Sequence, residues 1–288
     1  MSEAHVSRDT LLTHLRALEG ERHALTNPQR LDDAQAYLIE QFTRFGLSVE
    51  LDDCSLMGLR VVNVIARLQA PRDAPRLIVG AHVDTVPNSP GADDNASGVA
   101  AMLEVARVMM TCCPETPVEF VGFNLEEWGM VGSTHYATQL KRNRVPLLGM
   151  LSLEMVGFTE SKGLQHYPPL LKRFYPAVGN FIGLVANRRS KPLLKTVERA
   201  MRSVPALPVE TVVLPANGWL IPESRLSDHA PFWDAGYQAL LITDTAFMRN
   251  PHYHQPTDTV ETLDLAFLEK VCQGVVETVV ALSACARR

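Results

Sequence analysis

Apolar and polar positions follow two different periods along the chain, and together they predict a mixture of helices and strands. Apolar residues recur every three or four positions over residues 8–18 and 32–45, which predicts two helices near the start of the chain. Downstream, short apolar runs, some rich in β-branched residues, predict strands of a sheet. These runs are 46–54, 60–68, 76–82, 118–125, a strand ending at 152–155, 181–187 and 238–244.

Helical segments separate many of these strands. Residues 96–110 carry an apolar stripe, residues 193–204 are amphipathic, and residues 263–284 predict a long closing helix. Strands separated by helices are typical of a mostly parallel sheet covered on both faces, so the predicted fold class is a three-layer α/β sandwich. The chain contains no internal repeat and no low-complexity linker. We therefore expect one domain over residues 1–288, with a helical segment, 1–46, packed on it.

Two segments have no clear period. Residues 157–175 contain several prolines, glycines and tyrosines, and residues 205–225 contain four prolines. Both are predicted to be long loops at the rim of the sheet, where loops often shape the substrate pocket of an α/β enzyme.

The charge balance argues against one class of partner. The chain has 27 Lys and Arg against 32 Asp and Glu, a net charge of −5, with no basic run, so nucleic acid is not an expected partner. Apolar stretches such as 275–286 are too short, and too interrupted by Glu277, to span a bilayer. The first 20 residues lack the continuous apolar core of a signal peptide, so we expect a cytoplasmic protein that does not bind membranes. The oligomeric state stays open.

Cysteine usage indicates no disulfide framework and no zinc knuckle. The number of cysteines is odd, and none has C-x-x-C spacing. We predict reduced structural thiols, and we favour this over a redox switch formed by the adjacent pair at 112 and 113. The five residues are Cys54, Cys112, Cys113, Cys272 and Cys285.

Several residues that can carry chemistry stand directly after predicted strands. His82 and Asp84 form an H-x-D pair at the end of one strand, and Asp94 lies in a glycine-rich turn before a helix. Taken alone, each has an ordinary explanation as a hydrogen-bonded histidine, a turn or a helix cap. The consecutive residues Glu126 and Glu127 also have an ordinary structural explanation, because the dipole of a following helix favours acidic residues at its start.

Glu154 and His254 complete this set. Glu154 follows another apolar strand, and His254 lies in a proline-rich loop beyond the strand 238–244. In a parallel sheet the carboxyl ends of the strands meet at one edge, where ligands bind. Carboxylates gathered there repel one another unless a cation neutralises them. Because imidazoles and carboxylates suit zinc, the joint placement predicts a zinc site.

A series of ordered motifs carries a resemblance to a known family. GAHVDT, GADDNASGVA, NLEEWGMVGS, LEMVG, SDHAPFWDAGY and NPHYHQPTDT resemble, in order and spacing, the motifs of the zinc aminopeptidases of metallopeptidase family 28, the bacterial leucyl-aminopeptidase type. The resemblance extends from about Leu77 to Asp264. It implies a phosphorylase/hydrolase-like zinc-peptidase fold and two zinc ions per chain.

The same resemblance implies which residues hold the two metals. Asp94 matches the carboxylate that bridges both ions. His82 and Glu154 would complete one site, and Glu127 and His254 would complete the other. The chain departs from the family pattern at Glu154, where the usual ligand is an aspartate one methylene shorter.

Three catalytic roles are also implied by the resemblance. Glu126 matches the general base, and Asp84 matches the carboxylate that orients His82. Tyr253 matches a tyrosine that in some relatives hydrogen-bonds the tetrahedral intermediate. Together these residues imply hydrolysis of an amide by a metal-activated water.

Other polar residues in the motifs have plainer interpretations. Asp228 and His229 lie near the metal site in the family pattern, and we expect them to belong to a structural hydrogen-bond network. Asp258 is expected to be a turn or cap residue rather than a ligand. Four apolar or aromatic residues either line a side-chain pocket or belong to the core: Trp128, Met130, Phe158 and Tyr167.

The predicted function is that of a dizinc aminopeptidase, which removes the N-terminal residue from a peptide or aminoacyl amide. One alternative is a glutaminyl-cyclase-like acyltransferase, which resembles the same fold and motifs but uses a single zinc. A second is a small-molecule amidohydrolase or carboxypeptidase, although only 100 positions separate Glu154 from His254, which leaves little room for the dimerisation domain of that family. A non-catalytic binding module is disfavoured because every ligand position and the base are retained.

Overall fold

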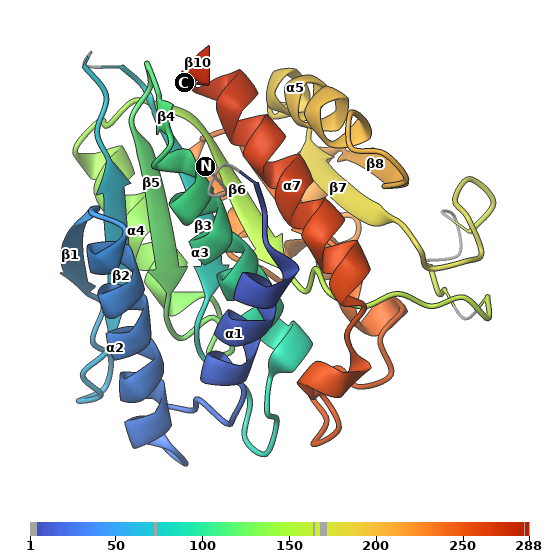
Figure 1. Ribbon diagram of the computed structural model, residues 1–288, viewed down its shortest axis with the longest axis horizontal. Helices are drawn as coiled ribbons and strands as arrows, with labels where there is room; N and C mark the ends of the chain where they lie inside the picture. Colours follow the sequence, from blue (N-terminus) through green and yellow to red (C-terminus); the bar gives the residue numbers. More distant parts are fainter. Residues whose placement is uncertain (1–4, 72–73, 164, 168–171, 285, 288) are drawn as a thin grey trace.

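The computed structural model describes residues 5–71, 74–163, 165–167, 172–284 and 286–287. Its central feature is an eight-stranded sheet, accompanied by a separate two-stranded one (Figure 1). Within the described ranges, no helix is long and apolar enough to cross a membrane. The strands are β1 (Ser48–Asp53), β2 (Val62–Leu68), β3 (Arg76–His82), β4 (Cys112–Cys113), β5 (Val118–Phe123), β6 (Leu147–Glu154), β7 (Ile182–Asn187), β8 (Val209–Leu214), β9 (Ala239–Thr243) and β10 (Ala286–Arg287).

The large sheet is mixed but mostly parallel, as predicted. Its strand order is β1-β2-β5-β3-β6-β9-β7-β8. The central strands β5, β3, β6 and β9 run parallel to one another. On one side β1 and β2 are antiparallel additions, and on the other β7 and β8 are parallel to each other but antiparallel to β9. The carboxyl ends of the four central strands therefore lie at one edge.

Helices cover both faces of this sheet, which confirms the three-layer α/β prediction (Figure 1). The larger core lies between the sheet and α1, α2, α3, α5 and α7. A smaller core on the opposite face includes residues of α4 and α6. The helices are α1 (Arg8–Leu18), α2 (Pro28–Arg44), α3 (Gly98–Met109), α4 (Val131–Arg142), α5 (Lys191–Arg202), α6 (His229–Ala235) and α7 (Leu265–Leu282).

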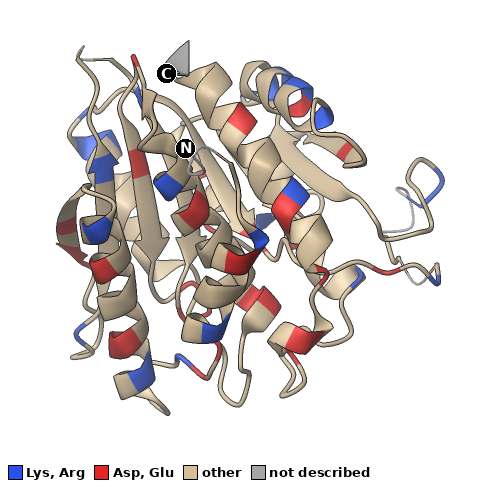
Figure 2. Cartoon of the chain, in the orientation of Figure 1, with Lys and Arg blue, Asp and Glu red and all other residues tan. Residues whose placement is uncertain are grey.

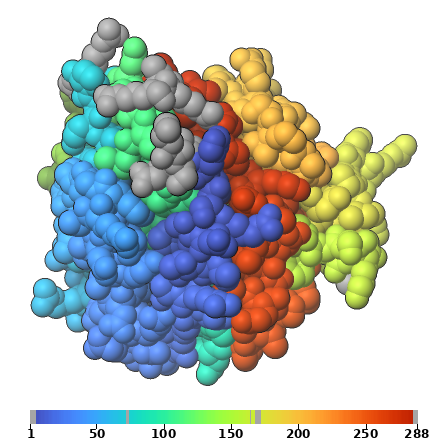
Figure 3. Space-filling model, viewed as in Figure 1, coloured from blue at the N-terminus to red at the C-terminus, as the bar shows by residue number. Residues whose placement is uncertain are grey.

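Local sequence explains where the first two helices begin. The Ser7 side chain accepts a hydrogen bond from the Thr10 N–H at the start of α1, and Asn27 caps α2 in the same way through Arg30. With Pro28 at its first position, α2 begins four residues before the predicted 32. In the folded chain α1 lies between α2 and α7 on the surface of the larger helical layer (Figure 3). The expectation of a single domain stays a prediction.

One element lies where the sequence predicted only loop. Residues 209–214 form β8, the edge strand, inside the segment 205–225 that was expected to be irregular. The run VETVVL has the β-branched composition of a strand, but it is short and flanked by prolines, which weakened its signal. The other predicted loop, 157–175, is irregular wherever the structure describes it, apart from a single bridge at Glu160.

Charge and thiols are distributed as in an ordinary globular protein. Charged residues lie mainly on the outer helices and loops, whereas the central strands carry few (Figure 2). Cys54 and Cys272 are buried free thiols, and Cys112 and Cys113 are also free. This agrees with the prediction of reduced thiols for these four, while Cys285 lies outside the described residues.

Candidate metal centre

The fold brings the predicted ligands to the carboxyl edge of the four central strands. His82 is the last residue of β3 and Glu154 the last of β6, and Glu127 follows β5. Asp94 lies in a short π-helical segment, Ala92–Ser97, directly before α3. His254 comes from the loop after β9. Segments that are far apart in sequence therefore supply one cluster, as predicted.

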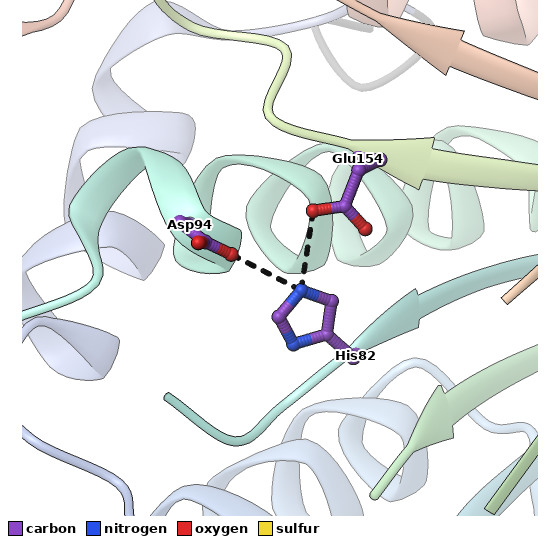
Figure 4. A group of neighbouring side chains, drawn as sticks. All are labelled: His82, Asp94 and Glu154. Carbon is purple, nitrogen blue, oxygen red and sulfur yellow. Dashed lines mark hydrogen bonds and ion pairs between the residues drawn. The ribbon is translucent and has the colours of Figure 1, made fainter. Parts of the chain in front are cut away.

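The first half of the cluster joins His82, Asp94 and Glu154 (Figure 4). The His82 Nε2 atom lies 3.2 Å from Asp94 Oδ1 and 3.3 Å from Glu154 Oε1. All three residues are buried. In Figure 4 the two carboxylates point toward the same ring nitrogen from different elements.

The second half repeats this arrangement on the other side of Asp94. The His254 Nε2 atom lies 3.1 Å from Asp94 Oδ2 and 3.2 Å from Glu127 Oε2. Asp94 therefore offers one oxygen to each imidazole. Three buried atoms here, Asp94 Oδ2, Glu127 Oε1 and His254 Nε2, make no hydrogen bond within the described part of the chain.

These distances fit the donor geometry of zinc. Protein ligands lie about 2.1 Å from a tetrahedral zinc, which places two ligand atoms about 3.4 Å apart. The measured nitrogen-to-oxygen distances of 3.1 to 3.3 Å are close to this value. Each half supplies three protein ligands, which is the number that leaves a coordination position open for water or substrate. The residues present therefore fit two cations that share Asp94.

Electrostatics of the carboxylates also favours a cation. Burial raises the pKa of Glu126 well above its usual range, and neighbouring Glu154 adds to this. Burial and the charge of Asp94 raise the pKa of Glu127 to about 7. Burial likewise raises the pKa of Glu154. These carboxylates repel one another in a site with little water, so positive charge placed between them is stabilising.

The two imidazoles respond in the opposite direction. Burial lowers the pKa of His82, but the charges of Glu154 and Glu126 outweigh it and raise the pKa well above its usual value. Burial also lowers the pKa of His254, but contacts with Asp94 and Glu127 outweigh this effect and raise the pKa to about 10. Metal cations would replace the protons that these rings otherwise hold, because imidazole binds metals in its neutral form.

Asp84 is placed to organise the loop that carries Glu126. Its Oδ1 and Oδ2 atoms accept hydrogen bonds from the backbone N–H groups of Glu126 and Glu127, at 3.1 and 3.2 Å. The His82 Nδ1 atom lies 3.1 Å from the Asp84 carbonyl oxygen and 3.6 Å from Oδ1. Asp84 thus contacts the histidine that it was predicted to orient and, in addition, fixes the two glutamates.

The longer side chain of Glu154 is held by a neighbour that sequence reasoning missed. The Ser227 hydroxyl donates to Glu154 Oε2 at 2.9 Å, and Ser152 Oγ lies 3.2 Å from Ser227 Oγ. The other carboxylate oxygen, Oε1, is the one that faces His82. Glu154 is therefore fixed in an orientation in which it can coordinate a metal despite its extra methylene.

Comparison with known proteins agrees with this geometry. The sequence profile of Peptidase family M28 matches residues 63–279, three quarters of the chain. The chain belongs to peptidase family M28. A relative from Escherichia coli strain K12, the uncharacterized protein YfbL, is 34% identical over 289 residues, covering 94% of this chain and 87% of the relative. Membership of the family makes this protein a hydrolase of the metallopeptidase type.

Two solved structures show how the M28 fold is shared. The LapA aminopeptidase of Legionella pneumophila superposes with a TM-score of 0.78 over 96% of this chain and 72% of that one, at 19% identity, which concerns the fold alone. BSAP, a zinc aminopeptidase from Bacillus subtilis, is 25% identical with a TM-score of 0.59. That match covers 78% of this chain but only 51% of BSAP, so this M28 chain spans about half of that protein's length.

A second layer of acidic residues in this M28 chain supports the segment that carries Asp94. Asp258 accepts hydrogen bonds from the N–H groups of Asp93 and Asp94, at 2.9 and 3.1 Å. It therefore caps that segment, as predicted, and is not part of the cluster. Asp93, buried behind the centre, accepts from the Gly157 N–H and from the Asn250 side chain.

The remaining predicted residues divide between the centre and its surroundings. The His229 Nε2 atom lies 2.9 Å from the Ser224 carbonyl oxygen, which is the structural contact expected of it. Asp228 is buried, and this burial raises its pKa to about 7. Tyr253 stacks on the ring of His254, with centroids 3.7 Å apart, and lines the metal centre.

The four apolar and aromatic candidates also divide. Met130 lines the metal centre, and Tyr167 lines a cavity beside it. Trp128 instead packs on His23, and Phe158 is buried against the ring of His252. Only the first two therefore meet the expectation of a pocket residue.

Arg22 supports the metal centre from outside the matched part of the M28 chain. Its buried guanidinium donates to the carbonyl groups of Val83 and Gly91, in the two segments that carry His82 and Asp94. It also donates to the carbonyls of Leu18, Gly20 and Pro90. An isolated arginine between two helices has no motif around it, so nothing in the sequence pointed to this role.

Proposed function

We propose that this M28 chain is a dizinc aminopeptidase, which hydrolyses the amide bond after the N-terminal residue of a peptide. The observation that carries the proposal is the position of Asp94 between His82 and His254. One of its carboxylate oxygens lies 3.2 Å from the His82 ring nitrogen, and the other lies 3.1 Å from that of His254. Glu154 and Glu127 supply the third ligand on each side. Bound zinc would polarise the scissile carbonyl and lower the pKa of the attacking water.

Glu126 is the general base in this proposal. It lines the same cavity as Asp94, Glu127 and His254, and its pKa is raised by burial, which suits a group that must accept and return a proton near neutral pH. Glu126 takes a proton from the water while the water oxygen attacks the carbonyl carbon. It then returns the proton to the leaving nitrogen as the C–N bond breaks.

Recognition of the substrate follows from the charges at the rim. The free α-ammonium group of a peptide carries a positive charge, and the carboxylates of Glu126, Glu127 and Glu154 surround the position where it would lie. Tyr253 lines both the metal centre and the neighbouring cavity, and in this proposal its hydroxyl donates to the oxyanion that develops on the substrate.

The experiment combines metal analysis with a single substitution. We expect two zinc ions per chain and hydrolysis of aminoacyl-p-nitroanilides by the wild-type protein. The Glu126→Gln variant should keep both metals and lose about 10³-fold or more in kcat, because general-base catalysis contributes roughly 10² to 10⁴. Elemental analysis and steady-state kinetics on the same preparations measure both quantities.

A matched control makes the same chemical change at an exposed position. Glu40→Gln, on the outside of α2, should leave kcat unchanged. Full activity in Glu126→Gln would remove the assignment of the base. A single zinc per chain together with cyclisation of N-terminal glutamine would replace the aminopeptidase proposal with the cyclase alternative.

A further inference from the structure

A cavity adjoins the metal centre and extends away from it. It contains about 960 Å³ of empty space, including its open mouth, and shares Glu154, Leu226 and Tyr253 with the metal centre. Its lining residues extend from Glu154 of β6 to Glu210 of β8, so the cavity crosses three further strands of the sheet. The cavity therefore extends beyond the reach of a short apolar side chain bound at the metal centre.

The floor of the cavity is a row of residues that crosses the sheet. Glu154 of β6 pairs with Thr243 of β9, Thr243 pairs with Gly183 of β7, and Gly183 pairs with Glu210 of β8. Paired residues of neighbouring strands lie on the same face of a sheet, and all four line the cavity. Since Gly183 has no side chain, the floor is low between Thr243 and Glu210.

This row fixes the distance from the metal centre to Glu210. Three interstrand spacings of about 4.8 Å separate the backbones of Glu154 and Glu210 by about 14 Å. A lysine or arginine side chain reaches about 6 to 7 Å from its α-carbon, and a charge-assisted hydrogen bond adds about 2.8 Å. The Glu210 side chain covers most of the distance that is left between the two backbones. A leucine in the place of the lysine or arginine would end far from the Glu210 carboxylate.

Charge in the cavity has one sign. Glu210 and Glu223 line it together with Glu154, and no lysine or arginine is among its lining residues in the described ranges. Glu210 is half-buried and makes no hydrogen bond or ion pair with any residue that the structure describes. A carboxylate in apolar surroundings without a partner is stabilised by a cation that enters beside it.

The walls suit the stem of a long cationic side chain. The stacked rings of Tyr167 and Tyr175, with centroids 5.7 Å apart, line the cavity near Glu210. Their hydroxyls donate to the carbonyls of Pro176 and Thr211, so the rings contribute mainly aromatic surface. Val185 and Val212 complete an apolar middle section. Apolar walls with a carboxylate at the far end match the methylene stem and charged head of lysine and arginine.

We propose that this cavity selects peptides with an N-terminal arginine or lysine, whose cationic head pairs with Glu210 while its stem lies over Gly183. This inference rests on the proposed aminopeptidase function and names its substrate class. Glu210 acts as a specificity-determining residue: it contacts the substrate side chain and takes no part in breaking the amide bond. Leucine is expected to be cleaved more slowly, because it leaves the Glu210 carboxylate without a partner.

The decisive comparison is between lysine and norleucine, which has the same stem without the ammonium group. With p-nitroanilide substrates, we expect kcat/KM of the wild-type protein to be about 10- to 100-fold higher for lysine than for norleucine, the range that a hydrogen bond between charged groups provides. The Glu210→Gln variant should reduce this ratio about tenfold or more and leave norleucine and leucine within about threefold of wild type. Glu210→Lys should invert the preference, so that norleucine is cleaved faster than lysine.

The control is the other carboxylate near the mouth. Glu223→Gln makes the same change at an exposed position on the same cavity and should alter the lysine-to-norleucine ratio by less than about threefold. Retained cleavage of leucine by each variant shows that the protein is folded and that its metal centre is intact. A norleucine rate equal to the lysine rate in wild type, or a ratio unchanged in Glu210→Gln, would overturn the inference.

Failure of the inference and failure of the proposed function give different results. If no aminoacyl-p-nitroanilide is cleaved by the zinc-loaded protein, the aminopeptidase function itself is wrong and the inference fails with it. If leucine and norleucine are cleaved as fast as lysine and arginine, the aminopeptidase function stands and only the role of Glu210 is lost.

Discussion

At the scale of single residues, the neighbours of each histidine decide whether its ring carries charge. His82 and His254 face carboxylates, which raise their pKa values against the effect of burial. His14 is buried in α1, where its Nδ1 atom lies 2.7 Å from the Tyr37 hydroxyl. Burial, followed by the charge of Arg107, lowers the pKa of His14 to about 4. The same side chain is thus cationic in one part of the metal-free fold and neutral in another.

This difference predicts how stability depends on pH. The unfolded His14 ring takes up a proton near pH 6.5, but the folded ring does so only near pH 4. Between these values the unfolded state binds more protons, so the free energy of unfolding falls as the pH falls, by about 3 kcal/mol from this ring. The contribution is fully present above pH 6.5. Urea unfolding of wild type and His14→Gln at about pH 7, 5.5 and 4.5 should show a shallower decline for the variant.

The control for this measurement is His166→Gln, which changes an exposed histidine and should keep the wild-type pH dependence. Identical pH dependence in wild type and His14→Gln would contradict the prediction.

The sequence located the residues of the cluster because four of them follow strands with a strong apolar signal, and the fifth, Asp94, lies in the turn before a predicted helix. His82, Glu127 and Glu154 could be placed at one edge from the strand pattern alone. The supporting residues Ser227 and Arg22 could not. Their roles depend on contacts with side chains or carbonyl groups far away in the sequence, and no local period or spacing records such contacts.

At the scale of elements, the sequence predicted the buried strands, but it missed the edge strand β8 and gave no range for the helices α4 and α6. The buried strands β3, β5, β6 and β9 were all predicted. The edge strand β8 was not predicted, because the prolines around it are typical of a loop. The same failure hid Glu210, since a residue assigned to a loop has no definite face or neighbours.

The connection between α1 and α2 supports the metal centre, and Arg22 is its anchor. We expect Arg22→Met, which keeps the bulk of the side chain but removes every donor, to lower the free energy of unfolding by about 3 kcal/mol or more. Carbonyl groups of Val83 and Gly91 would be left buried without these hydrogen bonds. Zinc affinity should fall as well, because the segments carrying His82 and Asp94 lose a common support. Urea unfolding and competition with a chelator measure the two effects.

Arg16→Met, an equivalent change at an exposed position of α1, serves as the control and should alter stability by less than about 0.5 kcal/mol. If Arg22→Met is as stable as wild type and binds zinc as tightly, the anchoring role is wrong.

At the scale of the whole molecule, the metals are expected to stabilise the fold. Their ligands come from the ends of separate strands and from the segment before α3, so bound cations connect regions that are distant in sequence. Zinc at about 1,000 times its dissociation constant stabilises the folded state by about 4 kcal/mol. With roughly 2 to 4 °C per kcal/mol, removal by a chelator should lower Tm by about 10 °C. Differential scanning calorimetry with and without chelator measures the shift.

Two variants test whether this shift arises at the proposed centre. Glu126→Gln keeps every ligand and should show the full change in Tm. Asp94→Asn alters the residue shared by both halves and should show little. A Tm that does not respond to chelator in the wild-type protein would contradict the prediction.

The overall architecture was predictable because alternating strands and helices leave few ways to build a parallel sheet, and because the ordered motifs resemble a known family. Family membership and the α/β fold are confirmed. The cavity was not predictable, since most of its lining comes from loops and from the edge strand β8, which no local pattern places beside the predicted strands β7 and β9. The number of metals remains part of the proposal.

The cavity floor meets the metal ligands at Glu154, yet the cavity and the ligands rely largely on different parts of the chain. His82 and Glu154 end central strands packed between two cores, and the other ligands lie on segments outside the strands, whereas most of the cavity wall belongs to β8 and to surface loops. Mutations that reshape the wall during evolution therefore need not disturb the strands beneath the ligands. A lineage built on this scaffold can therefore change its substrate preference while inheriting its metal ligands unchanged.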